Sequence, residues 1–205
     1  MRAKVQKLYC KTCGRHFQSA YKNTKVTATL LHQITHLNNE GMGISGIARL
    51  TGLSKGHVVN MIRKLAAAIC KPRLIETGQA YEADEMYTYI GHKVIPCYIM
   101  YAINRHSKQV IELIVGNRTK ENLKRIISAI IDLHPKRIFT DRLNIYSGLI
   151  DNKIHSASAY RINHIERFNL TLRTHVKRLN RKTICYSKSR EMLENCLKIY
   201  LWGRT

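Results

Sequence analysis

The first third of the chain carries apolar residues at the spacing of amphipathic helices. Three such segments follow one another, at residues 30–37, 44–50 and 55–66. A glycine-containing turn separates the last two, and Ser54 stands where a helix N-cap is expected. Two short helices joined by such a turn are typical of a helix-turn-helix, so residues 21–70 are predicted to form a small all-α domain of this kind.

The apolar pattern becomes strand-like after residue 80. Residues 81–91, 94–103 and 109–116 are rich in valine, isoleucine and tyrosine, and turn residues separate them. We expect three consecutive antiparallel strands, then a helix, a short strand and two more helices. The ranges expected for these last four elements are 119–133, 137–140, 160–180 and 189–201.

This order of elements predicts a mixed α/β fold for residues 81–205. Residues 71–80 contain a proline and a glycine and show no clear period. Such a segment is typical of a linker, so we expect it to join the helical domain to the α/β domain.

Composition narrows the classes of function. The 205 residues are 44% hydrophobic, which is enough for a buried core and excludes a disordered tail. Thirty-five Lys and Arg against 13 Asp and Glu give a net charge of +22, which predicts binding to a polyanion such as nucleic acid, with acidic substrates or a membrane surface as the alternatives. The sequence contains neither a bilayer-spanning apolar stretch nor a secretion signal at its start, so a cytoplasmic, nucleoid-associated protein with reduced cysteines is expected.

Acidic residues are scarce, so their positions carry information. Asp84 lies on the first predicted strand, and Asp141 directly follows a later strand, where α/β sheets often hold functional groups. Glu166 flanks the apolar stripe of the helix predicted for residues 160–180. Three carboxylates held together repel one another unless a cation joins them, and two Mg²⁺ or Mn²⁺ ions could then cleave and join phosphodiesters.

Two other acids, Glu82 and Glu85, are close to Asp84 in the sequence. Alternation along a strand places Glu82 on the face of Asp84 and Glu85 on the opposite face. We expect neither to belong to the site. The plainer alternative for all these acids is a set of separate surface salt bridges with the many basic residues.

Several blocks of the second half carry a distinctive combination of residues. They are residues 84–91, 140–146, 165–173 and 181–189. These blocks resemble the transposases of the insertion sequence 1 family, and the resemblance extends over nearly the whole chain. It implies a ribonuclease-H-like catalytic domain with an Asp, Asp, Glu triad, which falls on Asp84, Asp141 and Glu166.

The same resemblance implies that the first half supplies a zinc ribbon and a helix-turn-helix that binds terminal inverted repeats. The family's ribbon has two cysteine pairs, whereas residues 1–20 contain only Cys10 and Cys13. A structural Zn²⁺ needs four ligands. Residues 1–20 are therefore predicted to be a partial ribbon, in which nearby histidines could complete a zinc site.

Side chains from two segments are expected to contact double-stranded DNA. The recognition helix would face the major groove or its flanking phosphates with Lys55, His57, Asn60, Arg63 and Lys64. Phosphates near the scissile bond would be held by Arg167, Arg173, Lys177, Arg178, Arg181 and Lys182. A solvated basic helix face is the alternative for the outward members of this second group.

These expectations combine into a Mg²⁺-dependent DNA transposase that binds terminal inverted repeats and catalyses cleavage and strand transfer. Water would first cut at the transposon end, and the freed 3′-hydroxyl would then attack the target DNA. Holding two ends together requires at least a homodimer.

Two alternatives remain open from the sequence. A tyrosine recombinase would use Tyr186 as nucleophile together with His164 and Arg167, but it leaves Asp84 and Asp141 unexplained. A non-catalytic repressor would bind DNA through the helix-turn-helix and use the second half only to multimerise. Metal-dependent cleavage of DNA distinguishes the enzyme with the acidic triad from both alternatives.

Overall fold

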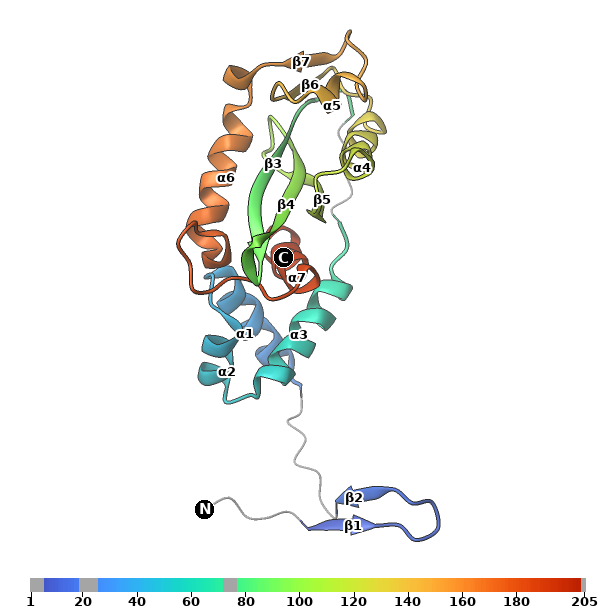
Figure 1. Ribbon diagram of the computed structural model, residues 1–205, viewed down its shortest axis with the longest axis vertical. Coiled ribbons are helices and arrows are strands. Elements are labelled where there is room, and N and C mark those ends of the chain that lie inside the picture. The colour runs from blue at the N-terminus through green and yellow to red at the C-terminus, as the bar shows by residue number, and fades with distance from the viewer. Residues whose placement is uncertain (1–5, 19–25, 72–76, 204–205) are drawn as a thin grey trace.

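The computed structural model describes residues 6–18, 26–71 and 77–203. Figure 1 shows the arrangement of the helices and strands along the chain. In order they are β1 (Lys7–Tyr9), β2 (His16–Gln18), α1 (Ala28–Asn39), α2 (Ile44–Thr51), α3 (Lys55–Ala68), β3 (Ala80–Ile90), β4 (His92–Asn104), β5 (Val110–Gly116), α4 (Lys120–Ile131), β6 (Arg137–Thr140), α5 (Asn144–Ser147), β7 (His155–Ala157), η1 (Ala159–Arg161), α6 (Asn163–His175), η2 (Lys177–Leu179) and α7 (Arg190–Trp202).

A five-stranded sheet with the order β5-β4-β3-β6-β7 forms the centre of the second half. β3, β4 and β5 are antiparallel neighbours, and β6 and β7 run parallel to β3. Along β3, the pairing with β6 covers the first residues, from Ala80 to Glu82. Beyond Glu82, the edge of β3 that faces β6 is therefore not paired with β6. The three predicted strands and the mixed α/β class are confirmed.

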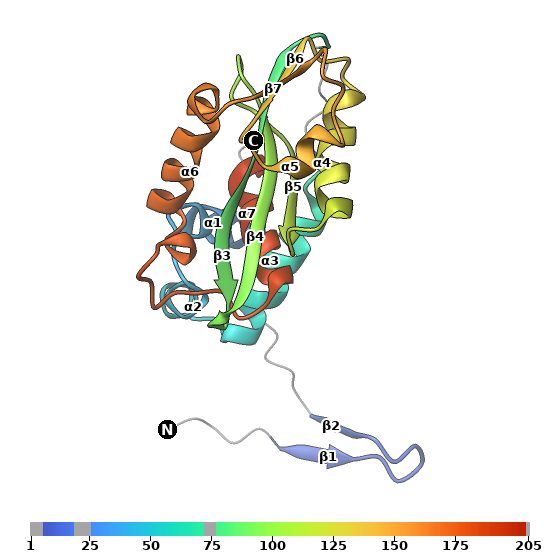
Figure 2. The same cartoon turned by 45° about the horizontal axis from the view of Figure 1, so that its top comes forward.

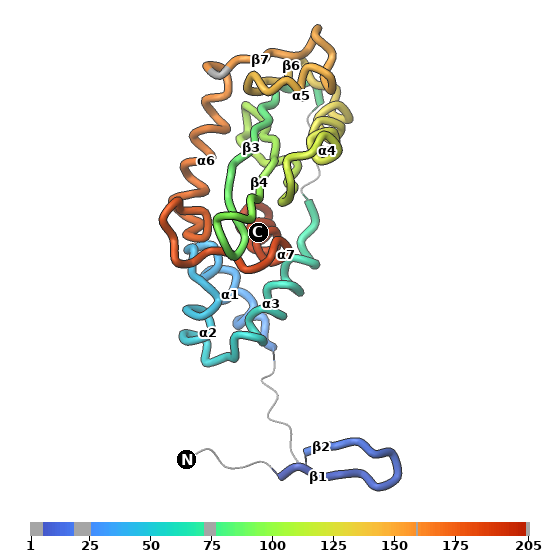
Figure 3. Tube along the Cα trace, viewed as in Figure 1, coloured from blue at the N-terminus to red at the C-terminus, as the bar shows by residue number. Residues whose placement is uncertain are grey.

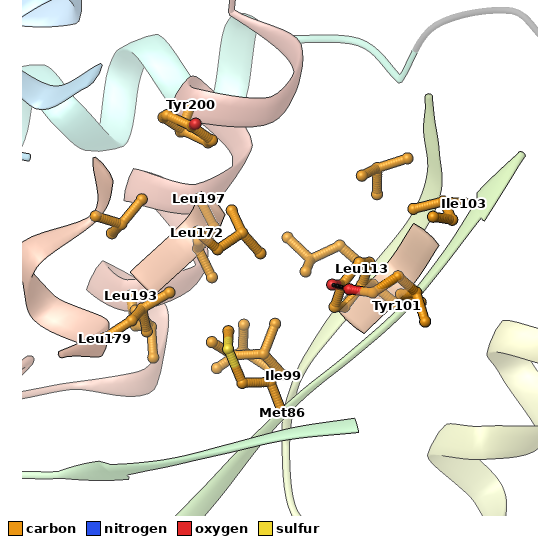
Figure 4. Packing of buried hydrophobic residues seen from close by; sticks show 14 of the residues in the cluster. Met86, Ile99, Tyr101, Ile103, Leu113, Leu172, Leu179, Leu193, Leu197 and Tyr200 are labelled. Carbon is orange, nitrogen blue, oxygen red and sulfur yellow. Dashed lines mark hydrogen bonds between the residues drawn. The ribbon is translucent and has the colours of Figure 1, made fainter. Parts of the chain in front are cut away.

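Helices cover both faces of the sheet (Figure 2). α6 and α7 pack on one face, where alternate strand residues such as Ile99 and Leu113 are buried against Leu172 and Leu197. Figure 4 shows this core from close by, with the α7 leucines opposite the strand residues. α4 and α5 cover the other face. Alternation of side chains along each strand therefore supplies two cores.

The three helices predicted for the first third of the chain are present as α1, α2 and α3. Ser54 caps α3 as predicted, because its side chain accepts a hydrogen bond of 3.2 Å from the backbone N–H of His57. Residues 19–25 and the linker residues 72–76 lie outside the described residues.

The core of α1–α3 is completed by α7 from the far end of the chain (Figure 3). Met192, Cys196 and Ile199 of α7 pack against the three helices, whereas Leu193 and Leu197 pack against the sheet. A helix that is apolar on two faces is stable only when both are covered. The helical unit and the sheet therefore share α7.

The prediction of one long helix over residues 160–180 is wrong. α6 covers only Asn163–His175, and Val176 leaves the helical conformation with φ −94° and ψ 87° before the short 3-10 helix η2. The change of direction buries both Val176 and Leu179 in the core. It is stabilised by Arg173, whose guanidinium donates a hydrogen bond of 2.8 Å to the carbonyl of Leu179.

Candidate functional site

Acidic side chains meet where β6 ends beside β3. The residue pair Glu82 and Phe139 is in register between the two parallel strands, so two residues further on Asp141 lies level with Asp84. One carboxylate oxygen from each of Asp84, Glu85 and Asp141 lies within 4.8 Å of the other two. We call these three residues the acidic cluster. All three are partly buried, and hard carboxylate oxygens at this spacing fit a Mg²⁺ or Mn²⁺ ion.

Glu85 belongs to the acidic cluster although strand alternation places it opposite Asp84. Beyond Glu82 the edge of β3 is no longer covered by β6, so side chains from both faces can reach the same edge. The hydroxyl of the buried Tyr146, on α5, donates a hydrogen bond to the Glu85 carboxylate. The expectation that Glu85 lies away from Asp84 and Asp141 is therefore wrong.

Asn169 of α6 holds the carboxylate of Asp84. Its side-chain amide donates a hydrogen bond of 2.7 Å to Asp84, and its amide oxygen accepts one of 2.7 Å from the hydroxyl of Tyr101. The relay fixes the orientation of the amide, because Tyr101 can only donate to its oxygen. Sequence reasoning missed Asn169; the available signal was its position one turn after Glu166 on the predicted helix.

Burial raises the pKa values of two members of the acidic cluster. For Asp84 the largest cause is burial, with a further rise from the charge of Asp141, while hydrogen bonds from the backbone of Glu85 and from Asn169 lower the pKa. Burial, together with the charges of Asp141 and Asp84, raises the pKa of Glu85 to about 7, against a lowering effect of the Tyr146 hydrogen bond. Three negative charges at this edge therefore call for a proton or a cation.

Glu166 lies outside the acidic cluster. Its side chain is exposed in the first turn of α6, three residues before Asn169. Residues three apart are neighbours on a helix surface, so Glu166 is on the part of α6 next to Asp84. The structure thus brings Asp84 and Asp141 together and leaves Glu166 at the rim.

Glu82 has a structural role. It is fully buried, forms an ion pair of 2.8 Å with Arg105, and accepts a hydrogen bond of 2.8 Å from the backbone N–H of Ile165. These contacts fix the start of α6 against β3. Arg105 also stacks over the ring of Phe139 on β6, at 4.2 Å from the ring centroid.

The residues predicted to contact DNA from α3 are mostly on its surface. Lys55, Asn60 and Lys64 are exposed. Arg63 is also exposed, but its guanidinium binds both carboxylate oxygens of Glu191 on α7, at 2.7 and 3.0 Å. His57 is half-buried, and its Nε2 has no hydrogen-bond partner among the described residues.

The second predicted group divides into two kinds. The exposed members are Arg167, Lys177, Arg181 and Lys182. Arg173 is half-buried and also donates a hydrogen bond of 3.2 Å to the carbonyl of Tyr87, so its guanidinium is occupied within the protein. Arg178 is only 7% exposed, and its Nη2 has no hydrogen-bond partner among the described residues.

Cys10 and Cys13 lie in the turn of the β1–β2 hairpin. A hydrogen bond from the backbone of Cys13 is the largest cause that lowers the pKa of the Cys10 thiol. Within residues 6–18, 26–71 and 77–203, these cysteines belong to no group of three or more potential metal ligands. A structural zinc needs four ligands, so the structure gives no support to the zinc prediction.

The geometry is unfavourable for the tyrosine recombinase alternative. The backbone of Ile165, next to His164, contacts Glu82, whereas the ring of Tyr186 lies 6.0 Å from that of Tyr89. The two contacts are seven residues apart on β3, which corresponds to about 23 Å at the rise of a strand. His164 is therefore too far along the sheet to assist an attack by Tyr186.

The fold and the site define a mixed α/β protein whose sheet edge carries carboxylates suited to a divalent cation. Residues 79–204 match the family model described as IS1 transposase. The chain belongs to the IS1 transposase family.

Curated relatives agree with this assignment. Insertion element IS1 4 protein InsB of Escherichia coli (strain K12) is 34% identical over 120 residues, which cover 58% of this chain and 72% of that protein. Insertion element IS1 protein InsB of Shigella flexneri is 33% identical over 120 residues, covering 58% of this chain and 92% of that protein.

Solved structures with weaker similarity include retroviral integrases. The intasome of simian T-cell lymphotropic virus in complex with PP2A regulatory subunit B56 gamma has a TM-score of 0.38 and 16% identity, covering 69% of this chain and 59% of that chain. The HTLV-2 integrase catalytic core domain in complex with magnesium (trimeric form) has a TM-score of 0.37 and 14% identity, covering 62% of this chain and 86% of that chain. Separately, none of the helices in the described residues combines the length and apolar character of a membrane span.

Proposed function

We propose that this protein is a DNA transposase that cuts and joins DNA at a divalent-cation site built on Asp84 and Asp141. The observation that carries the proposal is the convergence of these two carboxylates and Glu85 at the unpaired edge of β3, in a chain of the IS1 transposase family. Bound Mg²⁺ or Mn²⁺ would activate the attacking oxygen and stabilise the leaving oxygen of a phosphodiester.

The strand arrangement supports a ribonuclease-H-like catalytic domain. Three antiparallel strands are followed by two strands parallel to the first, in the order β5-β4-β3-β6-β7. Asp84 comes from the central strand and Asp141 from the end of the adjacent parallel strand. Asp141 directly follows the end of β6, where α/β sheets commonly bind their ligands, and Asp84 lies beside it within β3.

Glu166 is the third carboxylate in this proposal. It lies one helical turn before Asn169, which already binds Asp84, and its exposed side chain is free to change rotamer toward the acidic cluster. Glu85 is the second candidate, because it is already within the cluster. Asn169 would keep the Asp84 oxygens oriented toward the cation as an outer-shell partner.

DNA is the substrate class that the charge of the chain supports. A net charge of +22 would attract a duplex, and the exposed Lys55, Asn60 and Lys64 of α3 would contact terminal repeats as in a helix-turn-helix. Arg167, Lys177, Arg181 and Lys182 would hold phosphates near the site. Two DNA ends would be brought together by a homodimer or a larger oligomer.

Conservative substitutions of the acids test the proposed chemistry. DNA carrying the terminal repeats of the element is incubated with Mg²⁺ or Mn²⁺ and with Asp84→Asn, Asp141→Asn, Glu166→Gln or Glu85→Gln protein. Loss of an outer-shell partner typically lowers activity roughly 10- to 100-fold, and we expect Asn169→Ala to lower cleavage and joining by such a factor. The two aspartate variants should lose more activity than that, because each removes a direct ligand of the cation.

Glu166→Gln and Glu85→Gln are then compared. The variant whose cleavage activity is as low as that of the aspartate variants identifies the third ligand. Glu121→Gln, which changes an exposed acid of α4, is the control and should retain activity. Normal cleavage by Asp84→Asn and Asp141→Asn protein would refute the proposal. Specific DNA binding by wild-type protein without any metal-dependent cleavage would instead support a repressor.

A further inference from the structure

A cavity outside the acidic cluster lies between α2, α3 and the segment of residues 177–189. Its volume is about 830 Å³, within the range of pockets that bind small organic groups. The cavity is lined by residues from both segments that the sequence predicts to contact DNA. They are Lys55 and Arg63 from α3, and Lys177 and Arg178 from the segment after α6. We call it the junction cavity.

The junction cavity is strongly cationic. Its basic lining residues are Arg49, Lys55, Arg63, Lys177, Arg178 and Lys188. Among the described residues that line it, Glu40 is the sole acid. Glu191 already binds Arg63, but the structure gives no hydrogen-bond partner within the described residues to the buried Nη2 of Arg178. A buried guanidinium nitrogen without a partner is costly, and an anionic ligand would provide one.

The first turn of α2 adds a second anion-binding feature to the junction cavity. The N-cap residue Gly43 makes no side-chain capping hydrogen bond, and residues 43–46 line the cavity. The first backbone N–H groups of a helix are unsatisfied within the helix and favour negative charge. A Cβ on Gly43 would lie 2.8 Å from the Sγ of Cys185, so a larger residue at position 43 would force the Cys185 side chain to shift.

The junction cavity also has an apolar part that a phosphate alone does not require. Ile184 is 98% exposed, Leu50 is 60% exposed and Tyr186 is 37% exposed, and all three line the cavity. Apolar and aromatic side chains next to cations are what a nucleotide needs, because its base stacks while its phosphate pairs. A second copy of this chain is a poor occupant, since it would bring a charge of +22 toward the same cations.

We propose that the junction cavity binds an unpaired nucleotide of the DNA strand that is cut at the acidic cluster, with its base against Tyr186 and Ile184 and its phosphate at Arg178 and the start of α2. This inference rests on the proposed transposase function. Tyr186 contacts Tyr89, five residues beyond Asp84 on β3, which corresponds to about 17 Å. That length equals roughly five nucleotides at the rise of about 3.4 Å per nucleotide in each strand of duplex DNA. An unpaired nucleotide in the cavity would therefore fix the register of the strand at the acidic cluster.

Binding of labelled oligo(dT), measured by fluorescence anisotropy in EDTA, tests the inference without requiring catalysis. A duplex of equal length is measured in parallel. We expect Tyr186→Ala to weaken oligo(dT) binding about 10-fold, as the loss of one stacked base predicts. Arg178→Met should weaken it by a similar factor, about 10-fold, because a charge-assisted hydrogen bond to the phosphate is lost. Both variants should leave duplex binding almost unchanged. Lys124→Ala removes an exposed charge from α4, outside the cavity, and should weaken binding of both DNAs slightly and equally.

Folding of each variant is checked by circular dichroism, and the surface variant Ile184→Ala replaces Arg178→Met if the latter does not fold. Wild-type binding of oligo(dT) by the Tyr186 and Ile184 variants would overturn the inference while leaving the transposase proposal intact. Displacement of oligo(dT) by an equal nucleotide concentration of dTMP would also overturn it, because a free nucleotide would then be the ligand. Failure of the wild-type protein to bind either DNA would refute the proposed function itself.

Discussion

At the scale of single residues, the position of the sheet edge determines the chemistry of Glu85. A glutamate on the far face of a strand would ordinarily be a solvated surface acid, but here it lies beside Asp84 and Asp141 and under Tyr146. Burial and the two negative charges raise the pKa of its carboxyl to about 7. The folded protein consequently binds a proton at Glu85 over a pH range in which the unfolded chain does not.

This proton uptake predicts a pH-dependent stability in EDTA. Because the pKa of Glu85 is raised from 4.5 to about 7, the free energy of unfolding should fall as the pH rises through that range. Relative to Glu85→Gln, the wild-type protein should lose on the order of 2 kcal/mol between the lower and the upper end of this range. Urea unfolding of both proteins across the range measures the difference.

Glu121→Gln provides a control of opposite sign. Hydrogen bonds from the backbone N–H of Glu121 and from Thr119 lower the pKa of the Glu121 carboxyl, so this substitution should remove stability only when the pH is above the folded-state pKa. The prediction for Glu85 would be contradicted if the free energies of unfolding of the wild-type protein and of Glu85→Gln changed with pH in parallel. Glu85 would then have an ordinary pKa in the folded state.

At the scale of the elements, close backbone approach sets how the helices meet. Gly41 follows α1 with φ +72°, and a Cβ there would lie only 2.1 Å from the carbonyl oxygen of His175 at the end of α6. The turn between α1 and α2 therefore rests directly on the backbone of α6. Because that carbonyl belongs to the main chain, it cannot move aside as a flexible side chain would.

Gly41→Ala should destabilise the protein far more than Gly52→Ala. Gly52 has nearly the same backbone angle, φ +70°, but an added Cβ there would meet nothing within 4 Å. Gly52→Ala should cost about 1 kcal/mol from the left-handed backbone alone, whereas Gly41→Ala should cost about 3 kcal/mol because overpacking is added. Urea midpoints of the two variants measure the difference, and equal midpoints would contradict the packing described.

At the scale of the whole molecule, α7 makes the helical unit and the sheet depend on each other. Ile199 is buried against α1–α3, and Leu197, two residues away, is buried against the sheet. The hydrogen bond of 3.1 Å from Asn38 to the carbonyl of Cys196 and the ion pair of Arg63 with Glu191 add polar contacts across the same boundary. If α3 binds DNA as proposed, this arrangement fixes the position of that DNA relative to the acidic cluster.

A shared helix predicts one unfolding transition for α1–α3 and the sheet. Ile199→Ala and Leu197→Ala should each lower the free energy of unfolding by about 2–5 kcal/mol, because each removes a fully buried side chain. Both variants should move the same transition, followed by circular dichroism and by tyrosine fluorescence. Two separated transitions, with Ile199→Ala affecting only one, would indicate independent domains.

The sequence by itself determined what depends on neighbouring residues. Periodicity identified α1–α3, β3–β5 and α4, and the capping role of Ser54 followed from its residue type. The meeting of Asp84 and Asp141 was also predicted from the strands that carry them, whereas the register was not: Asp84 is the fifth residue of β3 and lies beside Asp141 because β6 starts level with the first residue of β3.

The tertiary structure alone decided what depends on distant segments. The end of β6 at Thr140 opens the edge that admits Glu85, and the path of α6 brings Asn169 to Asp84. The break at Val176 and the junction cavity follow from burial against elements far away in the chain. The local pattern of apolar residues indicates which face of a helix or strand is buried. It does not indicate where the neighbouring strand or helix ends in space. The position of that end determines which polar side chains meet.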